Sequence, residues 1–224
     1  MEEFAVKKLF TLSETIAADI FEGVVYPWEV LARIGDFIRR LGASLPQDRY
    51  EKREGDIWIA RSAIIYPSAC IQGPAIIDEE AQVRHCAFIR GSAIVGRGAV
   101  VGNSTELKNV ILFNKVQVPH YNYVGDSILG YKAHMGAGSV TSNVKSDRTP
   151  VVVRHGEAGV ETGLKKCGAM LGDEVEVGCN SVLNPGTVAG RKASIYPASS
   201  VRGYVPPGAI FKDQERIIPR KGQN

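Results

Sequence analysis

The chain has 224 residues, of which 44% are hydrophobic, enough to fill one large domain or a long repeat domain with a small appendage. Its 27 lysines and arginines are balanced by 24 acidic residues and form no long run, which argues against nucleic acid as a partner. No uninterrupted apolar stretch approaches about 18 residues, and the start lacks a basic segment followed by a long apolar one. We therefore expect no membrane insertion and no export, and a cytoplasmic location.

The N-terminal segment, residues 1–56, is predicted to be a helical appendage with a linker. Thr11 and Glu14 match a capping box ahead of an apolar-periodic stretch that ends at Gly23. Pro27 opens a second predicted helix, which Gly42 is expected to end. Residues 43–56 are polar and read as the linker to the next domain.

From residue 57 onward, aliphatic residues recur every six positions. The first series is Ile59, Ile65, Ile71, Ile77, Val83, Ile89, Val95, Val101 and Leu107. A second series follows at Leu171, Val177, Leu183, Ala189, Ile195 and Val201. Six residues are too few for a helical repeat and are typical of a parallel β-helix, in which each short strand buries one aliphatic residue. We therefore predict a mainly β, β-helical domain over residues 57–212, with a C-terminal tail at 213–224.

The residue before each inward aliphatic must face outward, because strand side chains alternate. Coils of 18 residues would stack two outer columns: Ile76, Ile94 and Leu112 in one, and Cys70, Phe88 and Glu106 in the other. The apolar column needs a cover, either a neighbouring subunit or the N-terminal segment.

The repeat is interrupted twice, and interruptions of a regular scaffold are places where function is expected. Between Phe113 and Tyr123 the spacing is ten, which reads as a register slip. Over residues 142–168 the pattern disappears and then returns in phase, which predicts a long loop projecting from a continuous prism.

Candidate catalytic groups lie near these interruptions. His120 is within the predicted slip, and an imidazole is the usual base for an amine that attacks a thioester. Glu106 is a carboxylate that would orient His120 if adjacent coils stack the two. Arg90, Lys108 and Lys166 are cations that together would clamp a phosphate.

The residues from Arg90 to Gly138 resemble the acetyltransferase domain of the bifunctional N-acetylglucosamine-1-phosphate uridyltransferase/glucosamine-1-phosphate acetyltransferase family. The resemblance covers roughly residues 57–212. Its motifs are H-x-x-Y-x-G-D at 120–126, G-A-G-S at 136–139, Asn143, and Lys166 placed six residues before Gly172 and Asp173.

This resemblance implies a left-handed β-helix with three hexads per coil, a homotrimer with sites between subunits, and acetyl-CoA as co-substrate without a metal. By the same resemblance His120 is the general base, and the acceptor is an amino-sugar 1-phosphate. The implied acceptor-binding residues are Arg90, Lys108, Tyr123, His134, Asn143 and Lys166. The implied coenzyme A groove runs past Ala137, Cys179 and Pro197 to Lys212, and the amides of residues 136–138 would polarise the thioester carbonyl.

Four positions depart from the family pattern: His134 replaces an Asn, Val144 a Tyr, Cys179 a Ser and Lys212 an Arg. The glycine-rich nucleotide loop of the uridyltransferase half is absent from residues 1–56, so we expect no intrinsic nucleotidyltransferase activity. The acceptor stays open among glucosamine 1-phosphate, galactosamine 1-phosphate and a nucleotide-linked amino sugar. Any of these would place the protein in nucleotide-sugar and cell-envelope metabolism.

Two other interpretations were weighed. A non-catalytic module that binds a sugar phosphate or nucleotide sugar, or that assembles with a separate nucleotidyltransferase, is the main alternative. A metal-dependent enzyme of carbonic-anhydrase type is disfavoured, because His85, His120, His134 and His155 lack the required spacing. The four cysteines, Cys70, Cys86, Cys167 and Cys179, show no zinc spacing and are expected to be reduced structural thiols.

Overall fold

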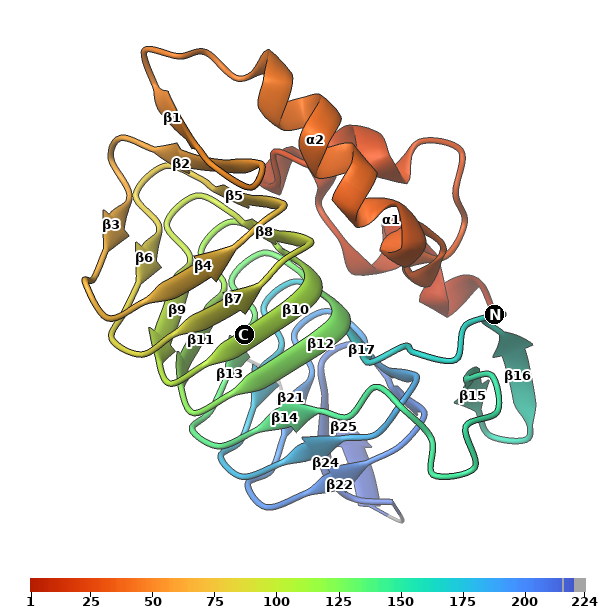
Figure 1. The fold of residues 1–224 in the computed structure, drawn as a ribbon. Coiled ribbons are helices and arrows are strands. Elements are labelled where there is room, and N and C mark those ends of the chain that lie inside the picture. Colours follow the sequence, from red (N-terminus) through yellow and green to blue (C-terminus); the bar gives the residue numbers. More distant parts are fainter. Residues whose placement is uncertain (215, 220–224) are drawn as a thin grey trace.

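Short parallel strands stacked in coils form a β-helix in the computed structural model, which describes residues 1–214 and 216–219 (Figure 1). Three rows of strands make up its walls. The first wall contains β3 (Ile64–Ile65), β6 (Gln82–Val83), β9 (Val100–Asn103), β11 (Gln117–His120), β13 (His134–Met135), β18 (Glu176–Val177), β21 (Ser194–Ile195) and β24 (Ala209–Asp213). The predicted fold class is confirmed.

The second and third walls share two long strands, β10 (Glu106–Leu112) and β12 (Tyr123–Leu129), which bend around the corner between them. The rest of the second wall is β4 (Cys70–Gln72), β7 (Phe88–Arg90), β14 (Val140–Thr141), β19 (Val182–Leu183) and β22 (Ser200–Val201). The rest of the third wall is β2 (Ile57–Ala60), β5 (Ala75–Ile77), β8 (Ala93–Val95), β17 (Ala169–Leu171), β20 (Thr187–Ala189) and β23 (Tyr204–Val205).

The inward aliphatic residues form the core as the six-residue period predicts. Those from Ile77 to Leu107 in the first series are all fully buried. Each such side chain contributes about 1.5–3 kcal/mol when it is removed from water. The alanines that precede them, such as Ala81 and Ala87, are also buried, because a larger side chain would not fit beside the next inward residue.

The predicted register slip between Phe113 and Tyr123 is wrong. Val118 occupies the inward position there and pairs with Val101 of the preceding coil. The six-residue spacing is instead one residue short in β10, where the inward residues Leu107 and Leu112 are only five positions apart. Ile94 is therefore paired with Ile111, 17 positions on, so the prediction that Leu112 continues the outer apolar column was also wrong. The column of Cys70, Phe88 and Glu106 stacks as predicted.

The first predicted helix does not form. Residues 11–23 contain only the 3-10 turns η2 (Leu12–Glu14) and η3 (Ala18–Phe21), preceded by η1 (Glu2–Phe4) and the short helix α1 (Val6–Leu9). Thr11 makes no capping bond, because its hydroxyl and amide both bond to Asp173 of the prism. A long-range contact has overridden the local capping pattern.

The second predicted helix forms with different ends. It starts as the 3-10 helix η4 (Pro27–Arg33) and continues as α2 (Ile34–Ser44). Gly42 lies inside α2 instead of ending it, and a Cβ there would lie 2.3 Å from the ring of Trp58. The predicted linker contains a strand, β1 (Tyr50–Arg53), which pairs antiparallel with β2.

Residues 1–44, which we call the strap, cover the outer side of the third wall (Figure 1). The outward residues of that wall form one apolar column: Trp58, Ile76, Ile94, Ile111, Ile128, Met170, Val188 and Tyr204. Phe4 packs edge-on against Tyr204 at one end, and Gly42 meets Trp58 at the other. Of the two covers considered for the apolar face, the structure has the N-terminal segment.

Asp173 is the main polar anchor of the strap. Its carboxylate is almost fully buried and accepts hydrogen bonds from the amide and hydroxyl of Thr11, at 2.9 and 2.7 Å. Arg191 forms an ion pair with the same carboxylate at 3.0 Å, and the Tyr131 amide donates to it at 2.9 Å. Because the charge is paired and hydrogen-bonded on all sides, its burial is tolerated.

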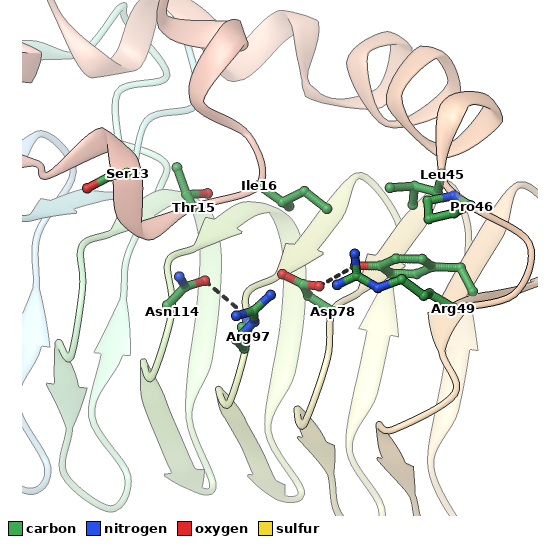
Figure 2. Close-up of a pocket in the computed structure, with 10 residues that line it drawn as sticks. Ser13, Thr15, Ile16, Leu45, Pro46, Arg49, Asp78, Arg97 and Asn114 are labelled. Atoms are coloured by element: carbon green, nitrogen blue, oxygen red, sulfur yellow. Dashed lines mark hydrogen bonds between the residues drawn. The ribbon is translucent and has the colours of Figure 1, made fainter.

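A hollow of about 320 Å³ lies between the strap, β1 and the coils (Figure 2). Its charged groups are paired with one another. Arg49 and Arg97 both form ion pairs with Glu79, and the Tyr50 hydroxyl donates to Asp78. The hollow is therefore a packed junction whose cations already have carboxylate partners.

The segment 142–168 contains a hairpin, β15 (Val152–His155) and β16 (Ala158–Glu161), which packs against β20 and β23. The coil resumes in register after it, with Thr141 paired to Leu183. At the C-terminus, β25 (Arg216–Pro219) pairs antiparallel with β24, and the rest of the predicted tail, residues 220–224, lies outside the described residues. None of the helices in residues 1–214 is long and apolar enough to span a membrane.

Gly42→Ala is expected to destabilise the fold by about 1–3 kcal/mol, because the added methyl overlaps the Trp58 ring at the strap–prism contact. Each kcal/mol corresponds to about 2–4 °C in the melting temperature of a chain of this size. Gly35→Ala, in the same helix, is the control. Its Cβ would lie 3.0 Å from the Ser92 hydroxyl oxygen and no closer than 3.7 Å to Pro74 and Arg39, so helix propensity should leave it neutral or up to about 1 kcal/mol more stable. Equal effects of the two substitutions would contradict this account of the contact.

Candidate functional site

One corner of the prism aligns four residues singled out from the sequence. His120, Ala137, Cys179 and Pro197 follow the first-wall strands of successive coils. The carbonyl oxygens of the first three each accept a hydrogen bond of 2.8–3.0 Å from an amide of the next coil. Coils stacked this way are about 4.8 Å apart, so the four residues form one row along the corner between the first and second walls. We call it the corner row.

The corner row ends at a hollow of about 590 Å³ near the C-terminus. Pro197, Lys212 and Arg216 are among its lining residues, so the last two predicted coenzyme A contacts share one cavity. The ammonium group of Lys212 lies 5.3 Å from the centre of the Tyr196 ring. Lys212 and Arg216 thus both border the hollow at this end of the corner row.

The second wall carries Arg90, Lys108 and Tyr123 of the predicted acceptor residues. Glu106 is paired with Phe88 on one side and Tyr123 on the other, and Lys108 is paired with Gly125. Arg90 and Lys108 each lie two positions after the Phe88–Glu106 pair, so they occupy equivalent positions about 4.8 Å apart on neighbouring strands. Two cations therefore lie side by side, Lys108 on the strand next to that of Tyr123 and Arg90 one strand further away.

Glu106 forms an ion pair with Arg90 and does not stack on His120. The Arg90 guanidinium donates to the Glu106 carboxylate at 2.7 Å and this ion pair raises the pKa of Arg90. The residue stacked on His120 in the preceding coil is Asn103, so the expected stacking of Glu106 on His120 was wrong. The reason is the corner: His120 ends a first-wall strand, whereas Glu106 begins a second-wall strand.

Tyr123 is held by a polar network that the sequence reasoning did not assemble. Asn143 donates to the Tyr123 hydroxyl at 3.3 Å and to Asp126, and Asn109 donates to the other oxygen of Asp126 at 2.8 Å. Burial of the ring and the charge of Asp126 raise the pKa of Tyr123, so the phenol stays protonated. Because its oxygen accepts from Asn143, its hydrogen is left to donate to a ligand.

Asp126 was visible in the sequence as the last residue of the H-x-x-Y-x-G-D motif, but Asn109 carried no signal. Asn109 and Asp126 lie where β10 and β12, respectively, turn the corner. Their φ angles are 55° for Asn109 and 47° for Asp126, a conformation that Asn and Asp tolerate better than most residues. Their side chains meet because the coils stack the two turns.

Lys166 is connected to this site through the backbone of the next residue, Cys167. The Cys167 amide donates to the Asn143 carbonyl at 3.0 Å, which ties the end of the 142–168 segment to the second wall. Cys167 itself is fully buried, and burial, followed by the charge of Asp126, raises its pKa to about 12. It is therefore a packing residue and not a nucleophile.

His134 and Val144 mark two of the departures from the family pattern. The His134 ring bonds to Glu176 at 2.8 Å on the first wall, so one of its nitrogens is already used. Val144 is exposed.

The expectation that the amides of residues 136–138 polarise the thioester carbonyl needs a correction, since the Gly136 and Gly138 amides donate to the Val177 and His120 carbonyls, respectively. Within the described residues only the Ala137 amide of these three has no acceptor.

The side chain of His120 is exposed and makes no hydrogen bond to any residue that the structure describes. His120 is the last residue of β11, and the next strand, β12, begins three residues later at Tyr123 on the second wall. Over residues 1–214 and 216–219, no three His, Cys, Asp or Glu side chains are grouped so that they would hold a metal ion.

Residues 71–200 match the family described as GMPPB C-terminal domain. This is more than half of the chain, so the protein belongs to that family, a group within the hexapeptide-repeat β-helix proteins.

Among its relatives is the bifunctional protein GlmU of Methanococcus maripaludis, 30% identical over 224 residues that cover 97% of this chain and 54% of the relative. The putative uncharacterized acetyltransferase YaiX of Escherichia coli is 29% identical over 167 residues, covering 75% of this chain and 73% of YaiX. A hexapeptide transferase family protein from Anaplasma phagocytophilum has a similar structure with a TM-score of 0.41 and 15% identity, covering 74% of this chain and 79% of that one. The chain spans about half the length of the GlmU relatives that it matches.

Three thiols are expected to react with a chromogenic disulfide reagent in the native protein at pH 8, and the fourth only after unfolding. Cys70, Cys86 and Cys179 are exposed, whereas Cys167 is buried with a pKa raised to about 12. The thiolate is the reactive form, so Cys167 is protected both by access and by protonation. Release of four equivalents at one rate from native protein would contradict the placement of Cys167.

Proposed function

We propose that the protein is an acetyl-CoA-dependent N-acetyltransferase of an amino-sugar 1-phosphate, active as a homotrimer. The single observation that carries the proposal is the juxtaposition of the corner row with the paired cations Arg90 and Lys108. His120 belongs to this row, one strand from Tyr123 and one coil before Ala137, and Lys108 and Arg90 lie on the second wall in the two preceding coils. A thioester lying along the row and a phosphate held by the cations would bring an acceptor amine to His120.

In the proposed reaction the sugar amine attacks the carbonyl carbon of acetyl-CoA in a ternary complex. His120 removes the ammonium proton, the new C–N bond forms, and the thiolate of coenzyme A leaves with the bonding pair and is then protonated. The Ala137 amide, which has no other acceptor among the described residues, is the candidate donor to the developing oxyanion.

The acceptor phosphate is assigned to Arg90, Lys108 and Lys166. Arg90 is oriented by Glu106 and presents its remaining donors outward, which suits a fork-like contact with phosphate oxygens. Tyr123 and Asn143 would contact the sugar, and Cys179, Pro197 and Lys212 would line the coenzyme A groove with no metal required. His134 is the least supported acceptor residue, because its ring is engaged by Glu176.

The homotrimer rests on the family resemblance alone. The apolar outer column that suggested a subunit contact is covered by the protein's own strap, so it no longer argues for association. A neighbouring subunit would instead close the corner row from outside. Light scattering coupled to gel filtration tests this directly.

His120→Ala is expected to lower kcat by about 10²–10⁴-fold with coenzyme A binding retained, because the proton acceptor is removed. Thiol release from acetyl-CoA with glucosamine 1-phosphate is the measurement. His85→Ala is the matched control: His85 occupies the same corner two coils earlier, is exposed, and should leave turnover unchanged.

If the wild-type protein neither binds coenzyme A nor acetylates any amino-sugar phosphate, the enzyme proposal fails. The protein would then be a sugar-phosphate or nucleotide-sugar binding or assembly module for a separate nucleotidyltransferase.

Lys108→Met is expected to reduce kcat/KM for glucosamine 1-phosphate by roughly 10–100-fold, the range for losing a hydrogen bond to a charged group. The effect on glucosamine, which has no phosphate, should be several-fold smaller. Lys115→Met is the control. Lys115 is exposed near Tyr131, at the corner between the third and first walls, and its substitution should change kcat/KM for neither acceptor. Equal losses with both acceptors would show that Lys108 does not recognise the phosphate.

A further inference from the structure

A second group of cations meets in a small hollow where the β15–β16 hairpin packs on the prism. The hollow measures about 90 Å³ and is lined by Lys145, Val152, Arg154, Pro185, Arg202 and Gly203. No acidic residue is among them. Three positively charged residues that are far apart in the sequence thus border one hollow.

The hairpin holds Arg154 firmly in this position. Val151 and Val153, on either side of the hollow-lining Val152, are fully buried. The backbone of Arg154 lies so close to Gly203 that a Cβ on that glycine would be 3.0 Å from the Arg154 carbonyl oxygen. The approach of hairpin and coil is therefore close-packed, and the cation cluster is part of the folded architecture.

The charges of this cluster are mostly uncompensated. Lys145 pairs with Asp147 at 3.3 Å, but Arg154 and Arg202 have no carboxylate partner in residues 1–214 or 216–219. The Arg202 guanidinium makes a long contact of 3.5 Å with the Asn184 side-chain oxygen. Beneath the strap, by contrast, Arg49 and Arg97 share Glu79. Like charges brought together repel, and an anion placed between them would relieve that repulsion.

We infer that the hollow of Lys145, Arg154 and Arg202 binds a phosphate group. Two guanidinium groups offer planar pairs of donors that match phosphate oxygens, and a lysine supplies a further charge. The volume suits one such group and is far below the roughly 300–1,000 Å³ of a pocket that encloses a whole small-molecule ligand.

This site is distinct from the cations assigned to the acceptor phosphate. By strand pairing, Arg202 occupies the same outward position as Lys108 but four coils further along the second wall. Four strand spacings of about 4.8 Å separate them by about 19 Å. One phosphate cannot reach both sites, so the ligand here is a second phosphate group, carried by a nucleotide, by coenzyme A or as the free ion.

The test is titration calorimetry of the full chain with inorganic phosphate, coenzyme A, dephospho-coenzyme A and a uridine-diphosphate sugar. Arg154→Gln and Arg202→Gln are each expected to weaken binding of the relevant ligand by about tenfold or more, as loss of a charge-assisted contact predicts. Arg154→Lys, which keeps the charge but loses the fork, should be intermediate. Melting temperatures establish that each variant is folded.

Arg148→Gln is the matched control, since Arg148 belongs to the same 142–168 segment but does not line the hollow. The ligand whose affinity depends on Arg154 and Arg202 identifies the source of the phosphate. If the variants lose affinity for coenzyme A but not for dephospho-coenzyme A, the site binds the 3′-phosphate of coenzyme A. If they lose affinity for the uridine-diphosphate sugar alone, the site binds a nucleotide phosphate. Dependence with inorganic phosphate alone assigns the free ion. The inference is overturned if the wild-type protein binds none of the four, or if folded Arg154→Gln and Arg202→Gln bind all of them as Arg148→Gln does. Neither result depends on whether the protein transfers an acetyl group.

Discussion

The hydrogen-bonded stacking of one coil on the next is the constraint on which the rest of this molecule depends. Each strand of the three walls pairs in parallel with its equivalents one coil away, so residues that share a position in the coil share a row on the surface. A side chain in such a row has its neighbours fixed at about 4.8 Å above and below. The corner row with His120, the paired cations Arg90 and Lys108, and the apolar column of the third wall are all consequences of that register.

Register also explains how the prism acquires its one apolar outer face and why the strap is needed. The third wall presents large aliphatic side chains on both sides, inward at Ile77 and Val95 and outward at Ile76 and Ile94. An uncovered apolar column of that length would be an aggregation hazard. The strap buries it with its own apolar residues, and Asp173 fixes the strap where Thr11 and Arg191 can share one buried carboxylate. The third wall is therefore closed within the subunit, and a partner copy would have to use the first or second wall.

Charge compensation separates the structural polar clusters from the candidate binding sites. Beneath the strap, and at Asp173, every cation meets a carboxylate, and these clusters join parts of the fold. On the second wall, Arg90 has Glu106, whereas Lys108 has no acidic partner among the described residues. At the hairpin, Arg154 and Arg202 also lack one within that part of the chain. Lys108 and Arg202 occupy equivalent outward positions of the second wall, and the two proposed phosphate sites lie on this wall.

The sequence by itself determined the β-helix, its inward residues and the motif around His120 and Tyr123, because a six-residue period and a short motif are local properties of the chain. It did not determine that residues 11–23 would form no helix, since the Thr11 hydroxyl bonds to a carboxylate 162 positions away. Nor did it locate the shortened coil, because Val118 satisfies the inward position only once the strands are paired. The pairing of Glu106 with Arg90 and the meeting of Arg154 with Arg202 likewise depend on which coil lies beside which. Only the tertiary structure decided these, because hydrogen bonds and charges act over a few ångströms in space and not along the sequence.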